Sequence, residues 1–318
     1  MKELVCEVDC ARVARNIVEY GKPVVLMAKA DCYGLGLTVA AAQAKYVAAY
    51  GVAFAEEGKT MRALTDKPIL VTTPVWTADE IARYALTPVV HGVEDVRKLA
   101  TIGADCAVHI KLDTGMGRYG VRSASELREV VREIARNPHL RPVAACTHYA
   151  AEADYVEQNK RLLTFLRELP RDIAVHTQAS STARKKGFDL LRIGLDAYRG
   201  CVRLATRVIA VHRPKAGERL GYDGEYTVKA GETVAVLAGG YADGIGKRLK
   251  GHLIWIGGRL APIVAVCMDV CFVATDRPCA VGDEAVILGE SPDPTGQSLY
   301  ETYTGLHGRV AFAYRGAE

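Results

Sequence analysis

The chain has 318 residues, of which 49% are hydrophobic and 25% are charged, and its formal net charge is +4. Such a composition is typical of a globular protein with one or two domains, and the absence of a basic block argues against a nucleic-acid partner. The N-terminal residues lack a long apolar segment and no run of about 18 apolar residues follows, so we expect neither secretion nor a membrane span. Nine scattered cysteines predict free thiols in a reducing cytoplasm and no metal site.

The first two thirds of the chain alternate between short apolar runs and segments with helical spacing. A first strand is expected at 4–8. The strand candidates that follow are 24–28, 52–55, 69–71, 86–90, 107–112, 143–147, 174–176 and 190–193. Helices are expected at 38–50, 77–84, 123–137 and 151–169, and capping boxes begin two of them (Thr77 with Glu80, Ser123 with Glu126). The alternation predicts an α/β barrel of the TIM-like (β/α)8 type, with a doubly wound sheet as the alternative.

The pattern changes near residue 206, where short apolar runs recur between Gly, Pro and Asp without a convincing helix. The strand candidates here are 208–211, 234–238, 253–256, 263–267, 271–274, 285–288 and 310–313. They predict a C-terminal all-β domain. We therefore expect a barrel over 9–203 and a β domain over 204–318. The strand at 4–8 should join the β domain, because a barrel is complete with eight strands.

One lysine, Lys29, directly follows the apolar run at 24–28. A lysine at the end of a buried strand is costly unless it is paired, neutral or modified, so its pKa should be lowered. A neutral amine is a nucleophile that can form a Schiff base. The alternative is a lysine whose ammonium group reaches past the strand end into solvent.

Polar residues also stand at the ends of other barrel strands, where catalytic groups of such barrels lie. They are Lys111, Asp113, Arg118, His148, Ser180 and Arg192. We expect these side chains to converge with Lys29 on one barrel mouth. Gly115, Gly117 and Gly120 also form a Gly-x-Gly-x-x-Gly pattern, but it follows the fifth barrel strand and not the first strand of a βαβ unit, so dinucleotide binding is the weaker interpretation.

Two motifs carry a resemblance to a known family. Residues 29–36 read Lys-Ala-Asp-Cys-Tyr-Gly-Leu-Gly, and residues 109–118 read His-Ile-Lys-Leu-Asp-Thr-Gly-Met-Gly-Arg. Both resemble the bacterial alanine racemases, whose cofactor is pyridoxal 5'-phosphate (PLP). The resemblance implies that Lys29 carries the cofactor and that Tyr33 contacts its phosphate. It also implies that Arg118 binds the ring oxygen and the substrate carboxylate, and that Lys111 is the lysine carbamylated in many members.

Further stretches of the barrel are similar to the same family. They are Thr-His-Tyr-Ala at 147–150, His-Thr-Gln-Ala-Ser at 176–180 and Arg-Ile-Gly-Leu at 192–195. By resemblance, His148 stacks on the cofactor ring and Ser180 binds the phosphate. Arg192 donates to the pyridine nitrogen, and the backbone N–H groups of Gly194 and Leu195 face the phosphate.

The β domain supplies the other half of the resemblance. Gly-Tyr-Ala-Asp-Gly at 240–244 is similar to the family motif whose tyrosine, here Tyr241, is the second catalytic base. Cys-Met-Asp at 267–269 is similar to the motif that places Met268 and Asp269 near the substrate carboxylate. In the family both motifs serve the partner subunit's site, which implies a head-to-tail homodimer.

The resemblance implies a cytoplasmic racemase that interconverts L-alanine and D-alanine with Lys29 and Tyr241 as its two bases, and supplies D-alanine for peptidoglycan. One departure is Gly308, which stands where the family has a phosphate-binding tyrosine. This departure keeps open a racemase for serine or a larger amino acid. A non-catalytic PLP-binding protein is the remaining alternative.

Overall fold

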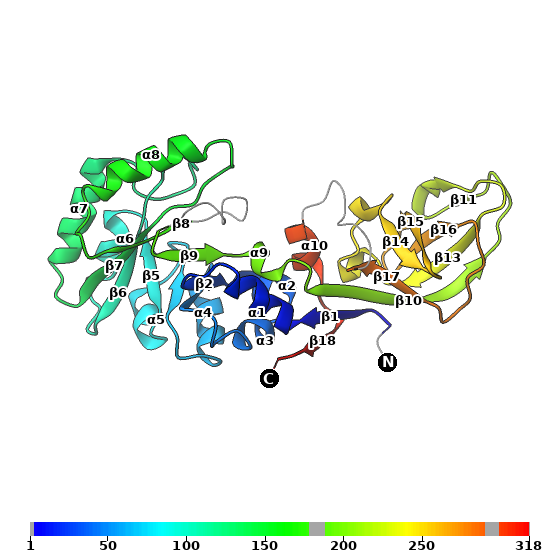
Figure 1. Cartoon of the computed structure of the whole chain (residues 1–318), viewed down its shortest axis with the longest axis horizontal. Helices are drawn as coiled ribbons and strands as arrows, with labels where there is room; N and C mark the ends of the chain where they lie inside the picture. The colour runs from blue at the N-terminus through cyan, green and yellow to red at the C-terminus, as the bar shows by residue number, and fades with distance from the viewer. Residues whose placement is uncertain (1–2, 178–187, 290–298, 318) are drawn as a thin grey trace. The chain divides into compact units, whose positions relative to one another are not determined.

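The computed structural model describes residues 3–177, 188–289 and 299–317, and Figure 1 shows its elements in chain order. The chain divides into two compact units. The barrel unit comprises Ala14–Cys32 and Ala40–Ala197, and the β unit comprises Met1–Val13, Tyr33–Val39 and Tyr198–Glu318. No helix in the described part of the chain is long and apolar enough to cross a membrane.

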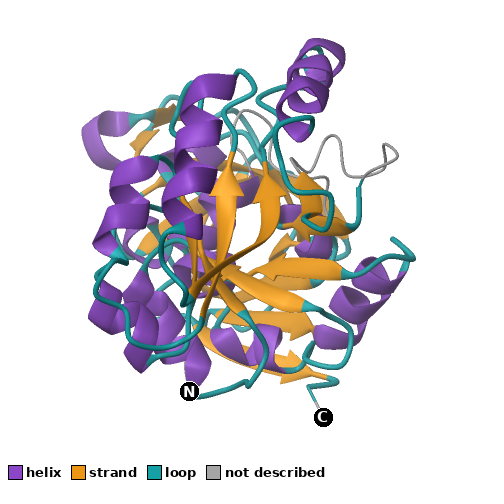
Figure 2. Ribbon diagram, turned by 90° about the vertical axis from the view of Figure 1, so that its left-hand side faces the viewer, coloured by secondary structure: helices purple, strands orange, loops and turns teal. Residues whose placement is uncertain are grey.

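Parallel strands close the barrel in chain order, and β9 pairs with β2 to complete the ring. The strands are β2 (Val24–Met27), β3 (Ala49–Val52), β4 (Ile69–Val71), β5 (Thr87–Val90), β6 (Cys106–Lys111), β7 (Leu140–Cys146), β8 (Ala174–Thr177) and β9 (Leu190–Ile193). Every residue of β2 to β5 is buried, as expected where side chains fill a barrel interior and helices cover its outside (Figure 2). The predicted (β/α)8 barrel is confirmed.

Short helices follow the strands, and local capping sets where two of them begin. The helices are α1 (Cys10–Val18), α2 (Lys29–Gly34), α3 (Leu37–Ala41), α4 (Ala55–Arg62), α5 (Ala78–Arg83), α6 (Val93–Lys98), α7 (Ala124–Ala135), α8 (Tyr155–Leu166) and α9 (Leu195–Tyr198). Thr77 and Glu80 form the predicted capping box of α5. At α7 the hydroxyl of Ser123 accepts the N–H of Glu126, but the Glu126 carboxylate accepts the N–H of Arg122 instead of that of Ser123.

The structure differs from the sequence prediction between residues 38 and 55. The alanine-rich segment was expected to be helical from 38 to 50, but α3 ends at Ala41 and β3 occupies Ala49–Val52. Tyr50 explains the difference, because its buried hydroxyl donates to the carbonyl of Ala40 at 2.8 Å and fixes the strand beside the helix. Tertiary contacts therefore override the helix propensity of the alanines.

The β unit is built on an eight-stranded sheet in the order β13-β16-β15-β14-β17-β10-β1-β18, with an additional pairing between β13 and β10. Its strands are β1 (Val5–Asp9), β10 (Val202–His212), β13 (Thr233–Ala238), β14 (Leu253–Ile256), β15 (Arg259–Val266), β16 (Val270–Thr275), β17 (Glu284–Leu288) and β18 (Ala311–Arg315). A separate two-stranded sheet joins β11 (Arg219–Leu220) to β12 (Tyr226–Thr227). The predicted C-terminal β domain is confirmed, but it also contains a helix that the pattern did not indicate, α10 (Leu299–Gly305).

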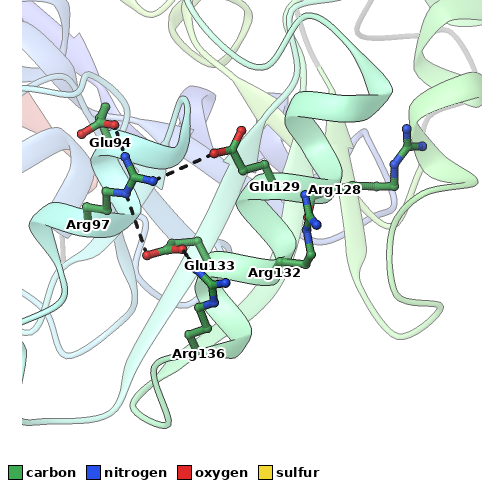
Figure 3. Close-up of polar contacts among 7 residues, drawn as sticks. All are labelled: Glu94, Arg97, Arg128, Glu129, Arg132, Glu133 and Arg136. Atoms are coloured by element: carbon green, nitrogen blue, oxygen red, sulfur yellow. Dashed lines mark hydrogen bonds and ion pairs between the residues drawn. The ribbon is translucent and has the colours of Figure 1, made fainter.

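On the outside of the barrel, Arg97 of α6 connects two helices (Figure 3). Its guanidinium group pairs with Glu94 on its own helix and reaches Glu129 and Glu133 of α7 at 4.0 and 3.9 Å. Glu133 also pairs with Arg136 at 2.9 Å. We call these residues the α6–α7 charge network.

Candidate active site

Lys29 lies just beyond the end of β2, at the barrel mouth. Burial lowers the pKa of its ammonium group, and the nearby Arg118 and Arg192 guanidinium groups lower it further. The carboxylate of Glu57 acts in the opposite direction and does not offset them. The expectation that Lys29 is a destabilised cation with an available amine is consistent with these surroundings.

The backbone after Lys29 is strained. Ala30, Asp31, Cys32 and Tyr33 all have φ between 51° and 59°, the left-handed region that costs an L-residue about 1–2 kcal/mol. The Glu57 carboxylate helps to hold this turn, because it accepts the N–H of Ala30 at 2.7 Å. It also accepts two N–H groups at the start of α4. Such strain concentrates at functional sites, and here it fixes the residue that follows the lysine.

Arg192 lies in β9 and is almost fully buried. Its Nη2 donates to the carbonyl oxygen of Thr147 at 2.7 Å, and its Nη1 donates to Nδ1 of His176 at 2.9 Å. Nδ1 of His148 lies 3.4 Å from Nη2. The side chain is therefore held by three residues from β8 and the end of β7, which fixes the plane of the guanidinium group.

Two buried histidines extend the hydrogen-bond network of Arg192 into the barrel interior. Since arginine can only donate, His176 accepts through Nδ1 and carries its proton on Nε2. Nε2 of His176 lies 2.8 Å from Nδ1 of His109, so the network assigns His109 as the next acceptor. Burial lowers the pKa of His109 to about 4 and holds that of His176 well below its usual range. Both rings are therefore neutral near pH 7 and support the Arg192 cation without adding charge.

Lys111 ends β6 with its side chain buried. Burial lowers the pKa of its ammonium group to about 8; Cys146 and Asp113 act against this shift, and Arg192 and Arg118 add to it. The side chain is also closely confined, because a Cβ on Gly120 would lie 2.8 Å from its Cγ atom. Lys111 is thus a second amine at this mouth whose ammonium group gives up its proton more readily than that of an ordinary lysine.

Asp113 shapes the loop that carries Arg118. Its carboxylate accepts the N–H groups of Gly115 and Gly117 at 3.1 and 3.0 Å. Burial alone would raise the pKa of this carboxyl, but the two N–H donors and the Arg122 and Lys111 cations outweigh burial and lower it. The glycines of the Gly-x-Gly-x-x-Gly pattern therefore serve to turn this loop.

His148 follows β7 and faces the same cations. Burial lowers the pKa of its imidazole far below the usual range, and Arg192 and Lys111 lower it further. A neutral ring is suited to stack against an aromatic ligand without adding to the positive charge of the site. The barrel unit thus brings together five of the predicted site residues, namely Lys29, Lys111, Arg118, His148 and Arg192.

The other predicted residues lie elsewhere. Gly194 and Leu195 connect β9 to α9, and the buried ring of Tyr33 lies in the β unit, 5.4 Å from each of the rings of Tyr198 and Tyr300. Ser180 is outside the described residues. Tyr241, Met268 and Asp269 lie in exposed turns of the β unit.

Sequence reasoning gave no role to several residues of the site. His109 and His176 stand in the sequence only as parts of longer motifs, and Glu57 belongs to no motif. The sequence does carry a signal for His109. It lies two positions before Lys111 on the same strand, so both side chains point to the same face of the sheet. No motif marks Glu57, because the N–H donor that links it to the lysine turn, that of Ala30, lies 27 positions away in the chain.

Two family models together match nearly the whole chain. The family model described as "Alanine racemase, N-terminal domain" matches residues 10–201, and the model "Alanine racemase, C-terminal domain" matches residues 201–314. The chain belongs to the alanine racemase family. It is 30% identical to an alanine racemase of Listeria monocytogenes over 89% of this chain and 87% of that protein. It is therefore an amino-acid racemase, and the family depends on PLP.

Solved structures show the same fold. An alanine racemase from Bacillus anthracis with bound L-Ala-P is 25% identical, with a TM-score of 0.88 over 99% of this chain and 95% of that chain. An alanine racemase from Bartonella henselae with covalently bound pyridoxal phosphate is 20% identical, with a TM-score of 0.88 over 98% and 99% of the two chains. A histidine racemase from Leuconostoc mesenteroides is 22% identical, with a TM-score of 0.86 over 99% and 98%. The fold thus accommodates more than one racemase.

Proposed function

We propose that this chain interconverts L-alanine and D-alanine with PLP as its cofactor. The observation that supports this proposal most strongly is the group of cations around Lys29, of which Lys111 and Arg192 are buried and Arg118 is exposed. Lys111, Arg118 and Arg192 all contribute positive charge there, which is costly unless an anionic ligand shares the site.

The donor set fits PLP, which carries a phosphate, a ring oxygen, a pyridine nitrogen and an aldehyde. Lys29 would bind the aldehyde carbon, Arg118 the ring oxygen and Arg192 the ring nitrogen. The phosphate would be held by Tyr33, Ser180 and the backbone N–H groups of Gly194 and Leu195. When bound, PLP supplies an electron sink for the bond between the substrate Cα and its hydrogen.

Arg192 selects which reaction that sink supports. A guanidinium group donates hydrogen bonds but does not give up its proton at neutral pH. It therefore binds an acceptor nitrogen without protonating it, which keeps the sink weak. A weak sink suits proton exchange at Cα and disfavours transamination or decarboxylation, which a carboxylate in this position would promote.

Racemisation needs one proton-transfer group on each face of Cα. The lowered pKa of Lys29 makes its Nζ atom a competent base on one face. Tyr241 of the partner subunit would serve the other face. When Nζ removes the Cα proton, the phenol Oη delivers a proton to the opposite face, and the reverse transfer returns the first enantiomer.

We propose that a second copy of the chain brings Tyr241 to the barrel mouth. Its side chain is 37% exposed, and that of Met268 is 46% exposed, so both are accessible to a partner. We propose a head-to-tail homodimer in which Met268 and Asp269 of the partner subunit lie near the substrate carboxylate. The product would serve peptidoglycan synthesis in the cytoplasm.

Lys111 is the proposed site of carbamylation. Its pKa of about 8 leaves a neutral amine that can add carbon dioxide, forming a carbamate and releasing one proton. The modification would exchange a buried cation for an anion beside Arg118. This would lower the repulsion among the cations and hold the guanidinium group in place.

Gly308 favours a second candidate, a racemase for serine or a larger amino acid. Its φ is +62°, and a Cβ there would meet no atom within 4 Å. Where a family tyrosine would bind phosphate and narrow the substrate entrance, this chain has open space. The non-catalytic alternative is not retained, because the family relationship makes the chain an enzyme.

Chiral chromatography of reactions started from L-alanine, L-serine and L-histidine tests the function. With PLP added, we expect alanine to give the highest kcat/KM. A higher value for serine or histidine would replace the alanine assignment with the second candidate. The Tyr241→Phe variant should lose about 10²–10⁴-fold in kcat. Full activity in that variant would remove Tyr241 as the second base.

A further inference from the structure

Two turns of the β unit lie against each other and share backbone hydrogen bonds. The Tyr241 turn (residues 239–244) follows β13, and the Met268 turn (residues 267–270) joins β15 to β16. The N–H groups of Tyr241 and Ala242 donate to the carbonyls of Cys267 and Met268, both at 3.0 Å. A Cβ on Gly240 would lie 2.2 Å from the Cys267 carbonyl oxygen, so only glycine permits this approach.

A single arginine ties the side chains of both turns together. Nε and Nη2 of Arg309 donate to the two carboxylate oxygens of Asp243 at 2.7 and 3.0 Å, and Nη1 donates to Asp269 at 2.7 Å. Asp243 also accepts the N–H of Gly240 at 2.9 Å. The planar fork of arginine matches this three-point arrangement, which a point charge such as lysine could not reproduce.

The exposure of these groups shows what the arginine contributes. The Asp243 side chain is 4% exposed, whereas that of Arg309 is 54% exposed. A buried carboxylate requires a paired cation, so Asp243 depends on Arg309. Arg309 itself fills little interior volume, so its removal opens no cavity in the core. The interaction therefore fixes the orientation of the turns more than it adds apolar packing.

We propose that Arg309 is a positioning residue for Tyr241, which it orients through Asp243 and the Met268 turn. It locks the turn that carries the proposed base to the turn that carries Met268 and Asp269. The distance between the proposed base, Tyr241, and the residues near the substrate carboxylate, Met268 and Asp269, then stays fixed, as proton transfer requires. This inference rests on the proposed function for the role of Tyr241, but the locking of the two turns does not depend on it.

Three variants of the PLP-loaded enzyme test the proposal. Arg309→Met removes the guanidinium group at similar length, and Arg309→Lys keeps the charge without the fork. The matched control is Arg259→Gln, because Arg259 forms a single 3.3 Å pair with Asp276 elsewhere in the same unit. We expect kcat to fall about 10–100-fold in Arg309→Met, less in Arg309→Lys and by under about twofold in the control.

The first readout separates positioning from general loss of structure. Alanine deuterated at Cα loses its deuterium to solvent when one base removes it. It is converted to the other enantiomer only when the second base also delivers a proton to the opposite face. Measured at a temperature where every variant is fully folded, a misplaced Tyr241 should raise the ratio of deuterium loss to racemisation by at least about threefold for the enantiomer whose proton Lys29 removes. An unchanged ratio in the folded Arg309→Met variant would overturn the proposal.

The second readout does not use activity. A 3-fluorotyrosine placed at position 241 reports its surroundings by ¹⁹F NMR. We expect a shifted or broadened resonance in Arg309→Met and an unchanged one in Arg259→Gln. If the resonance responds but the wild-type enzyme racemises no amino acid, the proposed function fails and the locking of the turns stands. An identical resonance in all variants would overturn the locking itself.

Discussion

The barrel mouth and the α6–α7 charge network are both rich in cations, but they hold them in opposite ways. At the mouth, the partly buried Lys29 and the buried Lys111 face further cations. The pKa values of both lysines are lowered. In the network, Arg97 reaches glutamates on two helices and stays half-exposed (Figure 3). One region holds like charges together, and the other pairs opposite charges in water.

This difference in charge pairing and burial indicates which of the two regions binds a ligand. Paired charges on a wet surface are screened and contribute little to stability. Like charges under partial burial repel and cost stability, so a fold retains them where a bound anion or a reaction uses them. Position and burial, and not residue type, therefore mark the functional region of this chain.

Among the changes that test this comparison of the two regions, the largest effect should come from changing Arg192 at the mouth. In Arg192→Lys a single ammonium group cannot serve the Thr147 carbonyl, His176 and a ligand together. We expect kcat/KM for alanine to fall about 10–100-fold, measured by chiral chromatography. The matched control is Arg136→Lys in the charge network, which should change activity by less than about twofold. Equal effects of the two substitutions would contradict the comparison.

A smaller effect, on the free energy of unfolding, is expected when the pH is lowered. An unfolded histidine binds its proton near pH 6.5, whereas burial lowers the pKa of His109 to about 4 in the folded chain. Between these values the unfolded state holds more protons, so the free energy of unfolding falls as the pH falls from about 6.5 to 4. One such group contributes roughly 3 kcal/mol at most.

Urea unfolding between pH 4 and 7 measures this loss. His109→Gln should show a shallower pH dependence of the free energy of unfolding than the wild type. A wild-type stability that is flat across this range would show that His109 is not held neutral by the fold.

The smallest effect should come from the α6–α7 charge network. Arg97→Ala removes contacts to Glu129 and Glu133 at 4.0 and 3.9 Å between half-exposed or partly exposed side chains. We expect a loss of less than about 1 kcal/mol in the free energy of unfolding, and added salt should reduce it further. A loss of several kcal/mol in the free energy of unfolding would contradict the claim that the charge network, unlike the barrel mouth, contributes little beyond screened surface pairs.

The barrel could be predicted from the sequence because most of its strands are short apolar runs ended by turn residues or charges. Lys29 was recognisable for the same reason, as a charge directly after such a run. The β3 strand was placed too late, because alanine, tyrosine and glycine carry no strand pattern and only the contact of Tyr50 with Ala40 fixes it. Helix α10 lacked an amphipathic signal strong enough to predict.

Side-chain networks could not be predicted, because they join residues far apart in the chain. The contact between His109 and His176 crosses 67 positions, and that between Arg309 and Asp243 crosses 66. Motif similarity indicated that these stretches matter, but not which atoms meet. The pairing of Arg309 with two turns required the three-dimensional positions of all three segments.

The most direct test of the account is to reduce the PLP-loaded protein with borohydride and map the modified peptide by mass spectrometry. Two lysines at the mouth have lowered pKa values, and the account assigns only Lys29 to the cofactor. We predict a stable adduct on the peptide that contains Lys29 and none on the peptide that contains Lys111. An adduct on Lys111, or a protein that takes up no PLP, would contradict the account.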